Sequence, residues 1–136
     1  MVSPHTNITE VAQGLDLLWR NDIPSKKVVL GLGFYGRSFT LADPSCNTPG
    51  CPFSSGAHPG ECTNQAGILS NAEIQRIISK NKLSPVLDKS AAVKYMTWDN
   101  DQWVSYDDAD TFNLKMNFAN KLGLGGTSKV PRYFLI

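Results

Sequence analysis

Tyr35 and Arg37 are the residues whose types and spacing are best suited to binding a ligand. They stand two apart in a segment expected to be extended, so both side chains point to the same face. A tyrosine ring with its hydroxyl, beside a guanidinium with several donors, suits a sugar, which offers apolar C–H faces, hydroxyls and carbonyls. The alternative is that Tyr35 packs in the core and Arg37 forms a structural ion pair. The residues alone leave both interpretations open.

Two tryptophans could also serve as platforms for a sugar ring. Trp98 stands next to an expected turn and is the better candidate for a surface position. Trp103 lies inside an expected strand beside Val104, and we expect it in the core. Trp98 is therefore added to Tyr35 and Arg37 as a candidate substrate-binding residue.

No side chain stands out as a catalytic acid, base or nucleophile. Paired carboxylates could perform general acid–base chemistry, but each pair has a structural explanation. Asp99 and Asp101 flank a turn, and Asp107, Asp108 and Asp110 precede or open a helix, whose dipole favours negative charge there. The two histidines each stand beside a proline in an expected loop, which gives little support to a nucleophile–histidine pair. We therefore assign no catalytic residue.

The three cysteines, Cys46, Cys51 and Cys62, lie in one loop-like region rich in proline, glycine and serine. Their spacing does not suit a zinc site, which needs a closer pair and a fourth ligand. We expect one disulfide inside this loop and leave the pairing open. Such bridges are typical of an oxidising compartment. The segment "GLGFYG" has the glycine spacing of a dinucleotide loop, but no helix follows it, and we expect neither cofactor nor metal.

Composition indicates a globular protein without a strongly charged partner. The chain is 41% hydrophobic and 18% charged, with a net charge of +1, which argues against nucleic acid or an anionic membrane as a partner. No apolar run approaches the roughly 20 residues of a membrane span. The opening residues lack the apolar stretch of a signal peptide.

Local patterns predict an α/β body with an inserted lobe. The stretch 6–22 predicts a helix capped by Asn7, with Glu10 as its return partner; a turn follows at 21–25, and then a strand buried on both faces within 26–35. Residues 41–67 show no periodicity. A second helix begins at Ser70 with Glu73 as its return partner, and 91–98 and 102–107 form a hairpin. A last helix follows Asp107, stops at Gly123, and is expected to turn four apolar side chains inward: Phe112, Met116, Ala119 and Leu122.

The order of several blocks resembles glycoside hydrolase family 18, the chitinases. "KKVVLGLGFYGRSFTL" is similar to the family's seventh barrel strand with its Tyr-Gly-Arg exit, and "VSPHTNITEVAQGLDLLWRNDIP" to the helix before it. "SCNTPGCPFSSGAHPGECTNQAGILSNAEI" resembles the start of the chitinase insertion lobe in the cysteine-bearing form of fungal secreted, killer-toxin-like chitinases. "VKYMTWDNDQWVSYDDADTFNLKMNFANKLGLGG" resembles the end of that lobe and the helix before the eighth strand. The resemblance covers residues 2–126.

The resemblance implies a partial (β/α)₈ barrel carrying an inserted α+β lobe. Residues 1–37 would form a barrel helix and the seventh strand, 38–106 the lobe, and 107–136 a helix and a divergent end. Tyr35 and Arg37 would line the sugar subsites beside the scissile bond. The chain would be a C-terminal fragment of an extracellular chitinase, with chitin or chito-oligosaccharide as its partner.

Two departures from the family pattern bear on activity and folding. The family's D-x-x-D-x-D-x-E signature, whose glutamate protonates the leaving oxygen, is absent from this chain. After Gly126 the family pattern also ends, and "TSKVPRYFLI" follows. We therefore expect an inactive chain in which the strand at 28–34 has both edges unpaired. The alternative is a non-catalytic chitin-binding remnant or a pseudogene product.

Overall fold

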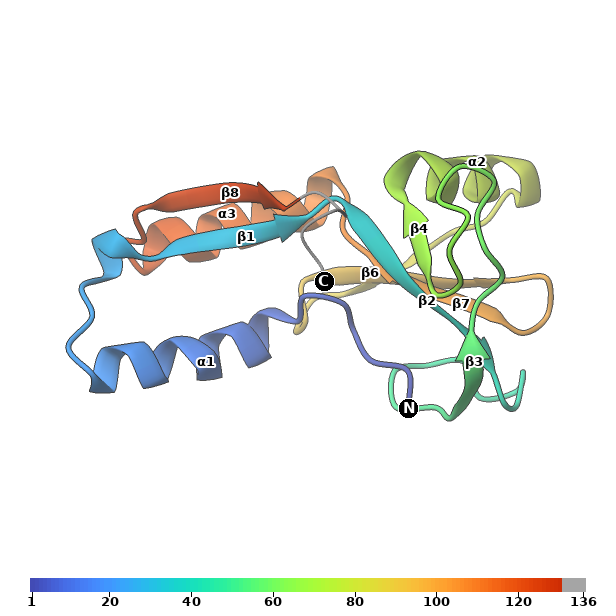
Figure 1. The fold of residues 1–136 in the computed structure, drawn as a ribbon, viewed down its shortest axis with the longest axis horizontal. Helices are drawn as coiled ribbons and strands as arrows, with labels where there is room; N and C mark the ends of the chain where they lie inside the picture. Colours follow the sequence, from blue (N-terminus) through green and yellow to red (C-terminus); the bar gives the residue numbers. More distant parts are fainter. Residues whose placement is uncertain (131–136) are drawn as a thin grey trace.

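The computed structural model describes residues 1–130 of the chain, which form two sheets and three α-helices (Figure 1). One sheet is a parallel pair, and the other has six antiparallel strands. The fold is therefore α/β. None of the helices in residues 1–130 has the length and hydropathy needed to cross a membrane. The elements in chain order are α1 (Ile8–Arg20), the 3₁₀ turn η1 (Ser25–Lys27), β1 (Val29–Gly33), β2 (Tyr35–Leu41), β3 (Phe53–Gly56), β4 (Ile68–Ser70), α2 (Asn71–Asn81), β5 (Val86–Asp88), β6 (Val93–Trp98), β7 (Gln102–Tyr106), α3 (Ala109–Lys121) and β8 (Gly126–Val130).

The parallel sheet joins β1 to β8, from Val29 opposite Gly126 to Gly33 opposite Val130. Helices α1 and α3 run alongside this pair (Figure 1). Leu30 and Leu32 pack against Ala119 of α3, with apolar side chains of α1 and α3 around them. The expectation that the strand at 28–34 has two unpaired edges is wrong, because β8 occupies one of them.

One further expectation about this region is also wrong. Strand β1 is buried on one face only: Leu30 is covered, whereas Val29 is 55% exposed, because α1 and α3 cover a single side of the pair. The sequence after Gly126 was expected to depart from the family pattern, and residues 126–130 form a strand. Its three central residues, Thr127, Ser128 and Lys129, are all polar and exposed. Residues 131–136 lie outside the described part.

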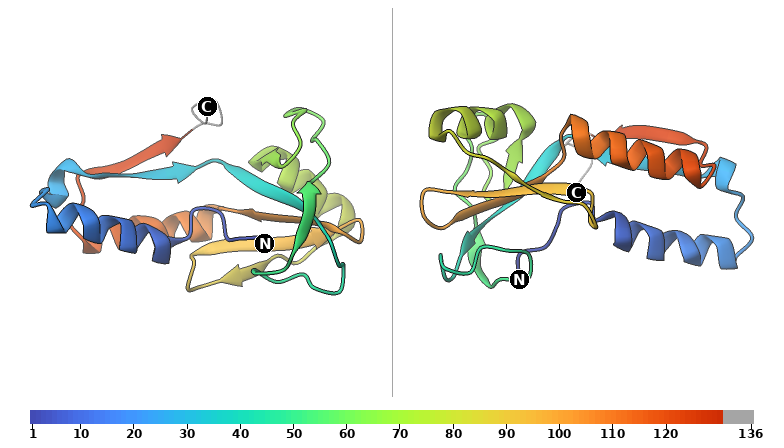
Figure 2. Two further views of the ribbon diagram at one scale, coloured as in Figure 1. Left: turned by 60° about the horizontal axis from the view of Figure 1, so that its bottom comes forward. Right: turned by 180° about the vertical axis from the view of Figure 1, so that it is seen from behind.

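The second sheet begins immediately after β1. Phe34 separates the two strands, and β2 then continues the chain into the antiparallel sheet, whose order is β3-β2-β7-β6-β5 with β4 also paired to β2 (Figure 2). The expected hairpin is confirmed: β6 pairs with β7 up to Trp98 opposite Gln102. Asp99 and Asn100 in its turn have φ of 46° and 73°, a left-handed conformation that Asp and Asn tolerate better than most residues.

Helix α2 covers one face of the antiparallel sheet. The expected capping box is confirmed: Ser70 Oγ accepts a hydrogen bond from the Glu73 backbone, and the Glu73 carboxylate accepts one from the Ser70 backbone. Ile74 of this helix packs on a cluster with Leu69, Met96, Val104 and Tyr106.

The opposite face of the sheet is covered by the N-terminal segment and the loop after β2. Trp103 lies in the centre of this second cluster, with Val2, Leu41 and Cys51 around it. A disulfide joins Cys46 to Cys51 with a Cα–Cα distance of 5.6 Å. The thiol of Cys62 is free and exposed. The Cys46–Cys51 disulfide therefore borders the cluster around Trp103.

The first and last helices depart from the expected details. Asn7 caps α1 by accepting from the Thr9 backbone, but Glu10 reaches only the Asn7 side chain, at 3.5 Å, and does not close a capping box. In α3, Met116 and Leu122 are exposed, so their expected inward placement is wrong. Ala119 is buried as expected, but Thr111 and Lys115 are buried with it, and Phe112 is half-buried.

Candidate functional site

Tyr35 and Arg37 lie together at the start of β2, on the face of the antiparallel sheet opposite α2. Tyr35 is 4% exposed and Arg37 is half-buried. Burial raises the pKa of Tyr35, whereas the charge of Arg37 and its hydrogen bond to the phenol lower it, and the net shift is upward. The hydroxyl of Tyr35 therefore stays protonated at neutral pH, next to a permanent cation. Both proposed sugar-contacting groups are thus adjacent hydrogen-bond donors.

His5 completes this corner, although no local sequence signal placed it there. Its ring lies 4.7 Å from that of Tyr35, and its backbone N–H donates to Ser105 Oγ at 2.9 Å. Burial, and then the charges of Arg37 and Lys115, lower the pKa of His5 to about 4. The imidazole is therefore neutral at pH 7. Its buried Nε2 has no hydrogen-bond partner among residues 1–130.

A buried ion pair stands behind this corner. Lys115 Nζ lies 2.6 Å and 2.7 Å from the two carboxylate oxygens of Asp107, whose side chain is fully buried, and Thr6 bonds to both groups. The interpretation of Asp107 as a helix-start carboxylate is therefore incomplete. Asp108 alone caps α3, by accepting from the backbone of Asp110 and Thr111. Lys115 at the inward spacing of α3 is the sequence signal that could have revealed the pair.

Trp98 is not brought to Tyr35 and Arg37. Arg37 stands opposite Ser105, which stands opposite Tyr95, so these three side chains share one face. Trp98 is three residues from Tyr95 on the same strand, and strand alternation therefore puts it on the other face. There it packs on the cluster beneath α2.

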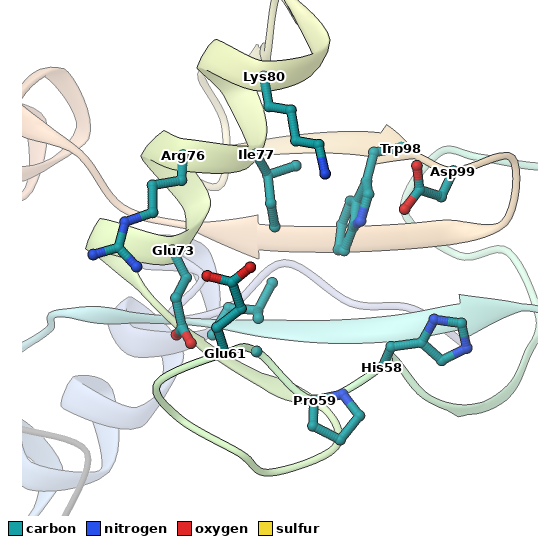
Figure 3. Close-up of a pocket in the computed structure, with 11 residues that line it drawn as sticks. His58, Pro59, Glu61, Glu73, Arg76, Ile77, Lys80, Trp98 and Asp99 are labelled. Carbon is teal, nitrogen blue, oxygen red and sulfur yellow. The ribbon is translucent and has the colours of Figure 1, made fainter.

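Trp98 and α2 border a pocket of about 240 Å³ (Figure 3). The loop at 58–61 and the hairpin turn complete its walls. No group of three His, Cys, Asp or Glu side chains in residues 1–130 is arranged to hold a metal ion.

Glu73 fixes the wall of this pocket. Its carboxylate accepts hydrogen bonds from the backbone N–H groups of Cys62, Thr63 and Ser70, at 2.7–2.8 Å. Burial raises the pKa of Glu73, but these bonds and that of the Ser70 hydroxyl outweigh it and lower the pKa to about 2. A side chain at Gly60 would collide with this carboxylate, so the loop passes close to α2 only because residue 60 lacks one.

We expect acid to weaken the fold through Glu73. Because its pKa falls from 4.5 to about 2 on folding, the carboxylate stabilises the native state fully above pH 4.5. This contribution is lost as the pH falls from 4.5 toward 2. Urea titrations at several pH values should show the free energy of unfolding dropping across that interval.

The Glu73→Gln variant provides the control for this titration. It should be less stable at pH 7, because an amide cannot accept the same set of bonds, and its free energy of unfolding should fall less between pH 4.5 and 2. Identical slopes for variant and wild type would show that other carboxylates cause the acid sensitivity.

The sequence of this chain is similar to that of a known protein family and of proteins within it. Residues 1–129 match the family model described as "Glycosyl hydrolases family 18". The match extends past residue 126, where the resemblance was expected to end. The chain is 34% identical to the "Secreted chitinase LysM12" of Penicillium expansum over 131 residues. This match covers 90% of this chain and 9% of that protein.

Two solved structures are similar in both sequence and fold. The Ostrinia furnacalis Group IV chitinase in complex with allosamidin is 30% identical to this chain, with a TM-score of 0.80. The match covers 86% of this chain and 31% of that one. Human YKL-39, described as a pseudo-chitinase with retained chitooligosaccharide-binding properties, is 33% identical with a TM-score of 0.78, over 85% and 31%. The chain thus spans about a third or less of the length of these relatives.

Proposed function

Because the chain belongs to glycosyl hydrolases family 18, we propose that it forms part of a chitinase and binds N-acetylglucosamine polymers through Tyr35 and Arg37. The observation that carries the proposal is the pairing of these two side chains on one face of β2, where a protonated phenol lies beside a guanidinium. Both groups can donate to the carbonyl and hydroxyl oxygens of an N-acetylated sugar. The similarity to human YKL-39, described as retaining chitooligosaccharide-binding properties, supports this choice of ligand.

We further propose that the two sheets correspond to two parts of a chitinase domain. Residues 1–37 and 107–136 would belong to a (β/α)₈ barrel, and residues 38–106 to the inserted lobe. The parallel pairing of β1 with β8, each next to a helix, supports the barrel assignment. Strand β2 crosses the boundary at residue 37, so the passage from barrel to lobe takes place within one continuous strand.

The proposed role of this chain is binding rather than hydrolysis. The 136 residues contain no D-x-x-D-x-D-x-E signature, and Asp107, the buried carboxylate behind the corner at Tyr35, is paired with Lys115. The similarity to human YKL-39 favours the second candidate function, a carbohydrate-binding module without catalysis. Secretion is proposed from the relative described as a secreted chitinase and from the Cys46–Cys51 bridge.

Replacement of Arg37 by alanine tests the site. The full chain should bind tetra-N-acetylchitotetraose, and Arg37→Ala should weaken this binding by about 1.5–3 kcal/mol, the usual loss for a charge-assisted hydrogen bond. Calorimetric titration measures the dissociation constants. Arg20→Ala, which removes an exposed arginine at the end of α1, should leave the affinity unchanged.

The same preparations should release no product from a fluorogenic chitobioside. Equal affinity of Arg37→Ala and wild type would assign Arg37 a structural role. Turnover of the chitobioside by wild type that persists through purification would overturn the non-catalytic assignment.

A further inference from the structure

We propose that the pocket beside Trp98 is a second sugar-binding site, which takes one N-acetylated hexosamine unit of an oligosaccharide. It lies on the face of the antiparallel sheet opposite Tyr35 and Arg37, so it is not an extension of that corner. The proposal rests on the proposed function only for the choice of N-acetylated sugars as probes. The geometry of the pocket is independent of it.

Three separate elements form the pocket. Helix α2 contributes Ile77 and Lys80, the loop before β4 contributes Glu61, and the end of β6 with the turn after it contributes Trp98 and Asp99 (Figure 3). Its volume of about 240 Å³ is below the usual range for sites that hold drug-sized ligands. This volume suits one sugar ring of an oligosaccharide whose other rings remain in solvent, rather than a whole oligosaccharide.

The lining combines one apolar surface with polar groups of both signs. The indole of Trp98, with Leu69 and Ile77, offers the apolar side. Lys80, Glu61 and Asp99 border it, and none of these three forms a salt bridge within the described residues. A ligand that carries one charge would be repelled either by Lys80 or by the carboxylates of Glu61 and Asp99. A neutral ligand with many hydroxyls can donate to the carboxylates and accept from the ammonium group.

The apolar wall favours an acetamido substituent. Ile77 stands beside the indole, where the methyl of an N-acetyl group would leave water. Glucose-type sugars lack that methyl and would gain only the contact of the ring with Trp98. The pocket should therefore distinguish N-acetylglucosamine oligomers from glucose oligomers.

The pocket is preformed, which lowers the cost of binding. Glu73 ties the loop at 60–63 to the start of α2 through its backbone hydrogen bonds. Trp98 is held from below by the packed cluster under α2. A ligand would not need to order either wall.

Nuclear magnetic resonance of the full chain tests the site directly. The indole N–H of Trp98, assigned with Trp98→Phe, should shift during titration with N,N′-diacetylchitobiose and much less with cellobiose. The shift should persist in Arg37→Ala, because the two sites lie on opposite faces. Trp98→Ala and Lys80→Met should raise the dissociation constant measured from Ile77 by about tenfold, whereas Trp19→Ala, on α1, should not.

The outcomes separate this site from the first one. A Trp98 shift in Arg37→Ala supports the second site even if Arg37 proves irrelevant to binding. An indole signal that does not move at any concentration of the chitobiose in wild type overturns it, and this result needs no variant to fold. Equal responses to cellobiose and the chitobiose overturn the choice of N-acetylated sugars.

Discussion

Replacement of Asp107 by asparagine should destabilise the chain by about 3–5 kcal/mol, the cost of leaving a buried charge without its partner. Lys115 is 3% exposed, and both Asp107 oxygens lie within 2.7 Å of its ammonium group. Asparagine preserves the shape of the side chain but removes the charge. The free energy of unfolding from urea titration gives the loss.

A second variant tests whether the cost arises from the unpaired charge. Lys115→Met added to Asp107→Asn should recover part of the stability, because neither ion then remains buried. Asp110→Ala is the surface control: its side chain is 71% exposed beside Lys94, so its loss should be at most about 1 kcal/mol. A loss at Asp107 no larger than that at Asp110 would contradict the prediction.

Trp103→Ala should cost about 3–5 kcal/mol, the range for removing a large buried aromatic side chain. Trp103 is fully buried, its ring is stacked on Tyr95 with centroids 5.8 Å apart, and its indole N–H donates to the Asn47 carbonyl at 3.0 Å. The variant leaves a cavity and releases the loop that carries the Cys46–Cys51 bridge. Thermal unfolding by circular dichroism should show a clearly lower midpoint.

Two control variants, Trp103→Phe and Trp19→Ala, accompany this experiment. The phenylalanine variant keeps a ring but loses the bond to Asn47, so its loss should lie between those of wild type and alanine. Trp19 on α1 is only half-buried, and its removal should cost much less. Equal losses at positions 19 and 103 would show that Trp103 does not organise the sheet.

The features that the sequence predicts correctly depend on neighbours within a few residues. Ser70 and Glu73 bond to each other's backbone across a single helical turn. Asp99 and Asn100 adopt the left-handed conformation in a short turn. The strands β3, β4 and β5 escaped prediction because each has only three or four residues. They are held by pairing with distant strands rather than by their own pattern.

The candidate site was predictable in part for the same reason. The common face of Tyr35 and Arg37 follows from strand alternation alone. The separation of Trp98 from them depends on the register of three strands, which no local pattern specifies. His5 reaches the corner through a hydrogen bond to a residue 100 positions away. The exposure of Met116 follows from the buried Lys115, a choice that a hydrophobic pattern does not anticipate.

The two faces of β2 are covered by different parts of the molecule. This difference restricts insertions and deletions within the strand. Tyr35 and Arg37 point to one side of this strand, whereas Gly36, which faces Ile74 and Val104, points to the other. Insertion or deletion of one codon within 35–41 would exchange the two sets, placing a guanidinium under α2 and Gly36 on the face that Tyr35 and Arg37 now occupy. Insertions in the connection at 42–50 leave this alternation intact. Length variation among natural variants should therefore concentrate in such loops and be absent from β2.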